Sequence, residues 1–332
     1  MLRFLHSRNL VIGVPLLCVI FLLMLESGAL SQENSTPFSK TTHTYKTVDE
    51  LEIQADVYRH EDAQKRPIIV WLHGGALIMG TRSGVPQQVL DLSRENGFVI
   101  VSLDYRLLPE AKLPDVIKDL EDGLQWVRES GPTLFNADPS RMVVAGASAG
   151  GYLALMSGIS VEPPPTAIVS YWGFGDVVGD WTTKPSESYR RGSLIEEETA
   201  LAGVGEQVLT NTDNVDGPGR SVYFVYLKQT GRWLTAAGGL DPEREQERID
   251  LFCPIRNVSP EYPPTLFLHG DADIDVPVGQ SLAMADELKR HGVDYELIVI
   301  EGGGHSLWGG DPVLIDQAFA RSMEYIQKRL TE

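Results

Sequence analysis

The sequence predicts an α/β protein whose mostly parallel central sheet is covered by helices on both faces. Segments of strand character alternate along the chain with segments of helical period, an order typical of parallel sheets. The strand segments in the middle of the chain are continuous apolar runs, as expected of strands buried on both faces. With 332 residues, 42% of them hydrophobic, the chain is long enough for one large domain with a sizeable core.

The first elements are predicted to form a β-hairpin, and buried strands and helices then alternate. Pro114 stands near the start of one helical segment, a position that proline favours. The hairpin strands are expected at residues 42–48 and 51–59, the later strands at 66–75, 97–106, 141–148, 166–174, 263–273 and 295–304, and the helices at 85–96, 113–130, 151–160, 278–292 and 312–330.

Residues 175–263 interrupt this alternation, and they are too many for a simple connection. They are predicted to be a mainly helical cap, inserted into a core formed by residues 32–174 and 264–332. The alternative is a structural excursion without a role in binding. Aromatic residues of the cap belong either to its own core or to the lining of a substrate pocket: Tyr223, Phe224, Tyr226 and Trp233.

Residues 1–31 have the order of an export signal. Arg3 and Arg8 precede a run of 16 uncharged apolar residues, and the small residues Ala29 and Ser31 suit cleavage before Gln32. The apolar run is shorter than the ~20 residues that span a membrane. A cleaved signal peptide and an exported protein, periplasmic or secreted, are therefore predicted, with an uncleaved membrane anchor as the alternative.

Charge and cysteine content exclude several classes of partner. The formal net charge of −18 disfavours nucleic acids and anionic membrane surfaces, which would repel the chain. Cys18 lies in the predicted signal, so Cys253 has no partner for an internal disulfide and is interpreted as a buried structural thiol rather than a nucleophile. No CxxC, HExxH or clustered His and Cys pattern occurs, so neither a metal nor another cofactor is predicted.

The segment GASAGG, residues 146–151, lies between a predicted strand and a predicted helix. In a G-x-S-x-G pattern the serine projects from a strained turn, and side chains two residues away on either side would collide there. Gly146 and Gly150 meet that requirement. Ser148 is therefore the candidate nucleophile, with a plain glycine-rich turn as the alternative.

Acyl transfer at a serine produces an oxyanion, which requires preorganised backbone N–H donors. The loop after the strand at 66–75 offers the N–H groups of Gly75 and Ala76, with Gly74 supporting the loop, and the predicted helix after the serine offers that of Ala149. His73 is an alternative base, but it is expected to hydrogen-bond its own loop instead.

The motifs HGGA (73–76), DYRLLPE (104–110), GASAG (146–150) and HGDADIDVP (269–277) occur in the order found in α/β-hydrolase esterases, which the chain resembles. It is similar to the hormone-sensitive-lipase-like group and to feruloyl or acetyl-xylan esterase-like proteins, over roughly residues 45–330 apart from the cap. The resemblance implies the α/β-hydrolase fold and a carboxylic ester substrate, either a small molecule or a carbohydrate-linked ester.

The resemblance also supplies the partners of Ser148. Such esterases have an acid after the next-to-last strand and a histidine after the last one. The D-x-x-V-P spacing selects Asp273, with Asp271 and Asp275 as alternatives, and His305 follows the last strand. In that arrangement the histidine takes the proton of the serine hydroxyl and later donates it to the leaving group. The acid fixes the tautomer of the imidazole and stabilises its charged form.

Within DYRLLPE, the resemblance implies a structural ion pair between Asp104 and Arg106, and Asp119 is expected to be a solvated or bracing carboxylate. Ala76 stands where many relatives have a third glycine, and the cap follows the fourth strand of the core rather than preceding it. Substrate preference is therefore not carried over.

Three functions remain open on this basis. An exported serine esterase is the preferred interpretation. A peptidase or amidase is the first alternative, because HGDADIDVP also resembles the acid loop of prolyl-oligopeptidase-like enzymes. A non-catalytic binding protein on the same fold is the second.

Overall fold

The computed structural model describes residues 37–213, 215 and 219–332, so the predicted signal at residues 1–31 lies outside the described residues. One sheet of eight strands has the order β1-β2-β4-β3-β5-β6-β7-β8. β2 is antiparallel to both β1 and β4, and every other neighbouring pair is parallel. The strands are β1 (Phe38–Val48), β2 (Leu51–His60), β3 (Arg66–Leu72), β4 (Val99–Leu103), β5 (Ala137–Ala147), β6 (Ala167–Tyr171), β7 (Thr265–Gly270) and β8 (Tyr295–Ile300).

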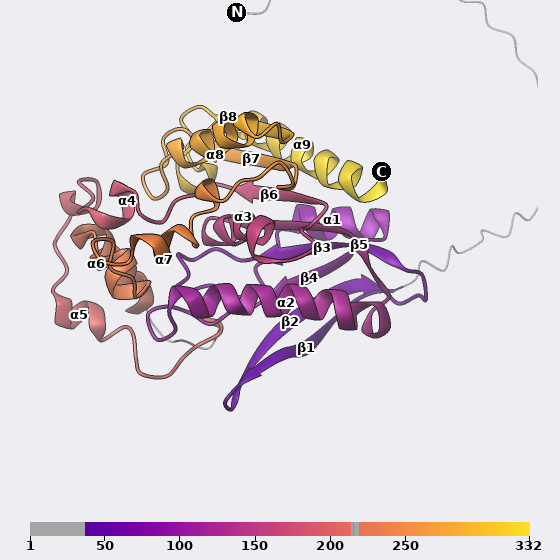
Figure 1. The fold of residues 1–332 in the computed structure, drawn as a ribbon, viewed down its shortest axis with the longest axis horizontal. Helices are drawn as coiled ribbons and strands as arrows, with labels where there is room; N and C mark the ends of the chain where they lie inside the picture. The colour runs from indigo at the N-terminus through magenta and orange to yellow at the C-terminus, as the bar shows by residue number, and fades with distance from the viewer. Residues whose placement is uncertain (1–36, 214, 216–218) are drawn as a thin grey trace, which may run out of the picture. The chain divides into compact units, whose positions relative to one another are not determined.

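Helices cover both faces of this sheet, as predicted (Figure 1). α1 (Gln87–Asn96) and α9 (Pro312–Thr331) pack on one face, and α2 (Leu113–Leu134), α3 (Ala149–Ser160) and α8 (Gly279–Arg290) pack on the other. The predicted helix at 113–130 continues to Leu134, with Pro132 inside its last turn. None of the helices that the structure describes is long and apolar enough to cross a membrane.

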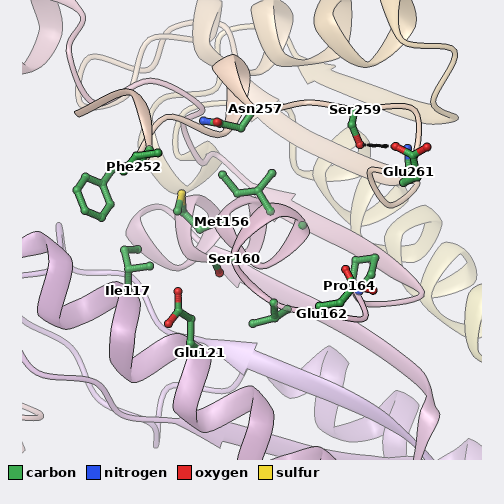
Figure 2. Close-up of a pocket in the computed structure, with 14 residues that line it drawn as sticks. Ile117, Glu121, Met156, Ser160, Glu162, Pro164, Phe252, Asn257, Ser259 and Glu261 are labelled. Atoms are coloured by element: carbon green, nitrogen blue, oxygen red, sulfur yellow. Dashed lines mark hydrogen bonds between the residues drawn. The ribbon is translucent and has the colours of Figure 1, made fainter. Parts of the chain in front are cut away.

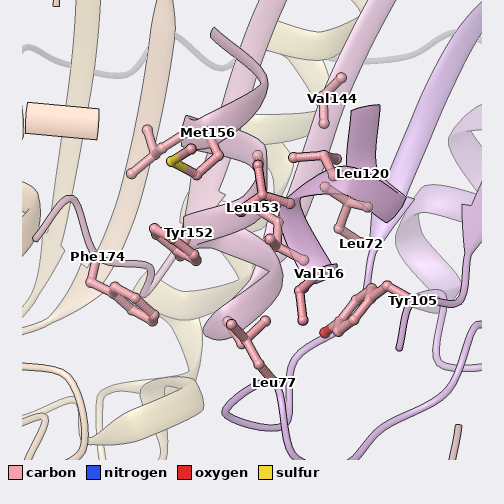
Figure 3. Close-up of a cluster of buried hydrophobic side chains, with 14 of the residues drawn as sticks. Leu72, Leu77, Tyr105, Val116, Leu120, Val144, Tyr152, Leu153, Met156 and Phe174 are labelled. Atoms are coloured by element: carbon pink, nitrogen blue, oxygen red, sulfur yellow. The ribbon is translucent and has the colours of Figure 1, made fainter. Parts of the chain in front are cut away.

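The alternation of side chains along β3 shows how one strand serves two cores. Ile68, Val70 and Leu72 face the cluster formed with α2 and α3, whereas Ile69 and Trp71 face the cluster formed with α1 and α9. All five are buried. Figure 3 shows the first cluster, in which Leu72 of the sheet lies among side chains of α2 and α3. Burial of each such side chain contributes about 1.5–3 kcal/mol, so this strand stabilises the packing of helices on both faces of the sheet.

The segment between β6 and β7 contains helical elements joined by turns, and α6 is the longest of them. Residues Thr36–Glu332 form one compact unit, so this cap is not a separate body. Its elements are α4 (Asp180–Thr183), η1 (Tyr189–Arg191), α5 (Glu197–Leu201), α6 (Gly219–Thr230), the π-helix η2 (Trp233–Ala237), α7 (Gln246–Asp250) and η3 (Pro254–Arg256).

One buried arginine docks the cap on the core. Arg220 of α6 donates from Nη1 to the carbonyl oxygens of Ile78 (2.7 Å) and Leu108 (2.8 Å), and from Nη2 to Glu110 Oε1 (2.7 Å). The Arg220 and Glu110 side chains are only 5% and 1% exposed. Because charged hydrogen bonds in a dry setting are strong and directional, these contacts fix how α6 lies over the loop that follows β3.

Candidate active site

The strand β5 ends in the predicted tight turn at Ser148. This serine has φ 56° and ψ −117°, a conformation that non-glycine residues rarely adopt, and α3 begins at the next residue. A Cβ atom on Gly146 would lie 2.3 Å from the Gly150 carbonyl oxygen, and one on Gly150 would lie 1.9 Å from that of Leu72. The turn is therefore packed so tightly against β3 that only glycine fits at both positions.

Three side chains from distant parts of the sequence meet at this turn. His305 Nε2 lies 2.9 Å from Ser148 Oγ, and His305 Nδ1 lies 2.7 Å from Asp273 Oδ2. Ser148 follows β5, Asp273 follows β7 and His305 follows β8, and the carboxyl ends of these parallel strands lie at the same edge of the sheet. Of the two alternative acids, Asp271 accepts from the Gly302 N–H and Asp275 accepts from a tyrosine hydroxyl, so only Asp273 contacts the imidazole.

The carboxylate of Asp273 is hydrogen-bonded at both oxygens. Oδ1 accepts from the backbone N–H groups of Asp275 (2.8 Å) and Val276 (2.9 Å), and His269 Nε2 lies 3.3 Å from Oδ2. Burial alone would raise the pKa of Asp273, but hydrogen bonds from His269 and His305 outweigh it and lower this pKa strongly. The acid is thus ionised at neutral pH and can stabilise a charged imidazole.

The first proposed oxyanion donor is oriented by His73. His73 Nδ1 donates to the Gly74 carbonyl oxygen at 2.8 Å, and because a peptide is planar and trans, the Gly75 N–H points the opposite way. The imidazole stacks on Tyr105, with ring centroids 4.2 Å apart. Burial lowers the pKa of His73 to about 4, so the ring is neutral at pH 7. As predicted, this histidine hydrogen-bonds its own loop.

The second proposed donor is oriented by a turn. The Gly75 carbonyl oxygen accepts from the N–H groups of Ile78 (2.8 Å) and Met79 (2.9 Å), which directs the Ala76 N–H away from them. Gly75 and Ala76 both have positive φ, 108° and 57°. The cap residue Trp233 donates from Nε1 to the Ala76 carbonyl oxygen at 3.1 Å, so the cap also contacts this loop.

The third proposed donor, the N–H of Ala149, stands at the amino end of α3, where the helix dipole favours negative charge. In the part of the chain that the structure describes, the N–H groups of Gly75, Ala76 and Ala149 donate to no other protein atom. Gly74 supports the turn closely, since a Cβ there would lie 2.9 Å from the Ala147 carbonyl oxygen. All four predicted oxyanion residues thus lie around the serine or in the loop beside it.

A pocket of about 390 Å³ opens at Ser148 and His305 and is mainly apolar. Phe224 and Trp233 of the cap line it, whereas Tyr223 and Tyr226 are buried elsewhere. Three further aromatic residues line the pocket and were not predicted from the sequence: Trp172, Phe174 and Trp181. Trp172 also makes an edge contact with the His305 ring. Its place directly after a buried strand, next to the strand that carries the serine, is the signal that would have found it.

The predicted ion pair between Asp104 and Arg106 does not form. Asp104 instead binds Arg82 and accepts from Asn211 Nδ2 at 2.7 Å. Arg106 binds Asp119 through Nε (2.8 Å) and Nη2 (2.9 Å). The prediction was wrong because both residues lie beyond Leu103, the last residue of β4, and each is already bound by other charged or polar side chains. Asp119 is a bracing carboxylate and is fully buried.

A larger cavity, about 660 Å³, lies away from this site between α2, α3 and the segment after α7 (Figure 2). None of the predicted site residues lines it. Cys253 is buried, and burial raises the pKa of its thiol to about 12, as suits a structural residue. Within the described residues, no three His, Cys, Asp or Glu side chains are placed to hold a metal ion.

Comparison with known proteins identifies a family and a fold for this chain. The family model BD-FAE matches residues 55–288, a range that includes Ser148, Asp273 and the cap but ends before His305. A curated relative is the non-reducing polyketide synthase prhL of Penicillium brasilianum, 27% identical over 328 residues. The alignment covers 83% of this chain but 13% of that synthase, so the chain spans about an eighth of the length of the curated relatives it matches.

Solved structures share the fold at low sequence identity. A Staphylococcus aureus Mu50 protein of unknown function has a TM-score of 0.70 and 18% identity, covering 88% of this chain and 100% of that one. Thermogutta terrifontis esterase 2, phosphoramylated by tabun, has a TM-score of 0.62 and 18% identity, covering 88% of this chain and 96% of that one. The sheet order and these similarities identify the α/β-hydrolase fold.

Proposed function

The chain belongs to the BD-FAE family of α/β-hydrolase esterases, and from this premise we propose that it is a serine hydrolase cleaving carboxylic esters through an acyl-enzyme intermediate. The observation that carries the proposal is the 2.9 Å approach of His305 Nε2 to Ser148 Oγ, with Asp273 on the other ring nitrogen. A serine hydroxyl is a weak nucleophile at neutral pH and needs a base at this distance.

In the proposed reaction, Ser148 Oγ bonds to the ester carbonyl carbon while its proton passes to His305 Nε2. The resulting oxyanion is stabilised by the N–H groups of Gly75, Ala76 and Ala149. Collapse of the tetrahedral intermediate breaks the bond to the alcohol oxygen, which takes the proton from His305. Water then attacks the acyl-enzyme, gives a proton to His305, and the acid product leaves as Ser148 regains its proton.

The substrate class follows from the pocket. Its volume of about 390 Å³ and its aromatic lining suit an ester of modest size with one apolar group. The net charge of −18 disfavours strongly anionic esters. A small-molecule ester fits these constraints directly, and a carbohydrate-linked ester fits when its acyl group alone enters the pocket.

The test is hydrolysis of a short-chain nitrophenyl ester, together with labelling by a fluorophosphonate. Ser148→Ala removes the nucleophile and is expected to lower kcat about 10⁴-fold or more and to abolish labelling. The exposed Ser140→Ala is the matched control and should retain both. A wild-type protein that neither hydrolyses esters nor labels favours a binding protein, and faster cleavage of a matched nitroanilide favours an amidase.

We further propose export, on the strength of Arg3, Arg8 and the apolar run that follows them. Expression in a bacterial host followed by amino-terminal sequencing tests this. A mature protein beginning at Gln32 supports a cleaved signal, recovery of the uncleaved chain in the membrane fraction supports an anchor, and uncleaved protein in the cytoplasm contradicts export.

A further inference from the structure

The orientation of the Asp273 carboxylate depends on the turn that follows it. Both hydrogen bonds to Oδ1 come from that turn, from the N–H groups of Asp275 and Val276. Oδ2 faces His305 Nδ1 at 2.7 Å, and His269 Nε2 lies 3.3 Å from the same oxygen. Any shift of this turn, residues 273–276, therefore rotates or displaces the carboxylate that holds the imidazole.

On the core side, His269 at the end of β7 holds the turn. Its Nε2 donates to the Val276 carbonyl oxygen at 2.9 Å, and its Nδ1 lies 2.8 Å from Ser281 Oγ on α8. His269 is fully buried. These contacts fix the end of the turn, but they do not reach its middle, where Ile274 is 59% exposed.

On the opposite side, two cap residues hold the middle of the turn through Asp275. Lys228 of α6 donates from Nζ to the Asp275 carbonyl oxygen at 2.9 Å and to the Trp181 carbonyl oxygen at 3.1 Å. Tyr189 of η1 donates its hydroxyl to Asp275 Oδ1. The carbonyl, the carboxylate and the N–H of this one aspartate are thus engaged by the cap on one side and by Asp273 on the other.

The lysine is an unusual choice for a contact of this kind. Lys228 is only 4% exposed, and among the described residues no carboxylate oxygen lies within 4.0 Å of its Nζ. Two carbonyl oxygens and the Trp181 ring, whose centroid is 5.1 Å away, replace its water shell. Burying an ammonium group is costly, and a methionine of similar length would fill the space at less cost.

We propose that Lys228 and Tyr189 are positioning residues for the catalytic acid, because they tie the cap to Asp275 and so hold the turn that orients Asp273. The inference rests on the proposed function, since it concerns the same site. It assigns the cap a part in proton transfer in addition to lining the pocket. Lys228 and Tyr189 do not touch the imidazole of His305. They act on it indirectly, because they bind Asp275 and thereby position Asp273.

Two variants test the proposal. Lys228→Met removes the ammonium group at similar length, and Tyr189→Phe removes only the hydroxyl while keeping the ring that packs against Phe224. We expect kcat for a nitrophenyl ester to fall about tenfold in Lys228→Met and about threefold in Tyr189→Phe, with KM within about twofold, because positioning acts on the transition state. Since both act on Asp275, the double variant should lose less than the product of the single losses.

The second readout is the low-field proton resonance of His305 Nδ1–H, which reports the hydrogen bond to Asp273 without any substrate. It should shift or broaden in both variants. Lys184→Met and Tyr226→Phe, at an exposed cap lysine and at a cap tyrosine bonded to Arg232, are matched controls that should leave kcat and the resonance unchanged.

The outcomes separate the two proposals. An active wild type whose Lys228→Met and Tyr189→Phe variants fold, keep kcat and keep the resonance overturns the positioning role. If Lys228→Met does not fold, Tyr189→Phe decides the question by the same two measurements. A wild type without hydrolysis or fluorophosphonate labelling overturns the proposed function instead, and the resonance still shows whether the cap residues orient Asp273.

Discussion

At the scale of single residues, the candidate site depends on main-chain atoms whose direction is set by their neighbours. Gly75 and Ala76 offer donors only because the carbonyl on the other side of each peptide is engaged, by His73 in one case and by a turn in the other. In the proposed reaction, His73 therefore influences the stability of the oxyanion although it touches neither Ser148 nor Asp273. Its neutral state, enforced by burial, keeps Nδ1 as a donor and leaves Nε2 without a proton.

The loss of kcat in His73→Phe distinguishes two roles for His73, orienting the oxyanion loop and acting as the catalytic base. In His73→Phe a ring remains to stack on Tyr105, but the donor to Gly74 is lost. We expect kcat to fall about tenfold with KM nearly constant, which is less than the 10²–10³-fold loss of an entire oxyanion donor. Steady-state kinetics on a short-chain ester measure this. A loss of about 10⁴-fold or more would instead mean that His73 is the base.

At the scale of elements, α6 is unusual because it directs two cations into the protein. Arg220 near its start and Lys228 near its end are both almost fully buried, and each binds carbonyl oxygens of the core or of the cap. In sequence the helix looks ordinary, because the aromatic run RSVYFVYLKQT gives no sign that its lysine faces inward. Lysine usually extends its amine to water, so the tertiary contacts override the expectation from residue type.

Buried Lys228 should make stability depend on pH in a defined window. Burial lowers the pKa of its ammonium group from 10.5 to about 8, although Asp275 and Asp273 oppose the shift. Between pH 8 and 10.5 the unfolded chain thus holds a proton that the folded chain has released, so this residue makes the free energy of unfolding rise with pH. Relative to Lys228→Met, wild type should gain about 2 kcal/mol between pH 7.5 and 9.5.

Urea unfolding of both proteins at the two pH values measures this difference, and other titrating groups cancel in the comparison. Lys184→Met, at an exposed lysine paired with Asp180, should follow wild type at both pH values. Parallel pH profiles of wild type and Lys228→Met would show that the amine is not buried as a charged group.

At the scale of the whole molecule, the cap and the core belong to one compact unit. Arg220 binds core carbonyls and Glu110, and Trp233 binds the loop that offers the oxyanion donors. Core and cap are joined by buried polar contacts as well as apolar ones. Unfolding should therefore be a single cooperative event that includes both.

Arg220→Met tests that cooperativity. It leaves the Glu110 carboxylate buried without its ion-pair partner, which should lower the free energy of unfolding by about 3–5 kcal/mol. Unfolding by urea, followed by tryptophan fluorescence and by circular dichroism, should still give one coincident transition. Arg232→Met, at a half-exposed arginine of the same cap, should cost about 1 kcal/mol or less. Two separated transitions in either protein would contradict a single unit.

Much of this architecture is readable from the sequence because its signals are local. Continuous apolar runs, which alternate with segments of helical period, predict every central strand. The segment GASAGG predicts the turn at Ser148, where the structure requires glycine at positions 146 and 150. The partners of Ser148 were not a local signal: the resemblance to α/β-hydrolase esterases selected Asp273 and His305, and the structure places them beside the serine because β5, β7 and β8 end at one edge of the sheet. Their catalytic roles stay a prediction.

The contacts made by the cap are not readable in the same way. The pairing of Asp104 with Arg82, the inward course of Lys228 and the bond from Tyr189 to Asp275 join segments that no periodicity relates. They depend on how an irregular segment folds back over the sheet, which many weak contacts decide together. Trp172 and Phe174 lie between these cases, because their strand was predicted but their direction toward the pocket was not.

The position of His305 along the chain has a consequence for biosynthesis. A ribosome makes Ser148 157 residues before His305, and in between it makes β6, β7 and β8. In terms of the proposed reaction, a product that terminates before His305 contains the nucleophile without its base. Nascent chains that lack His305 are therefore expected not to hydrolyse esters, and the onset of hydrolysis in a timed translation reaction would mark the moment at which His305 reaches Ser148.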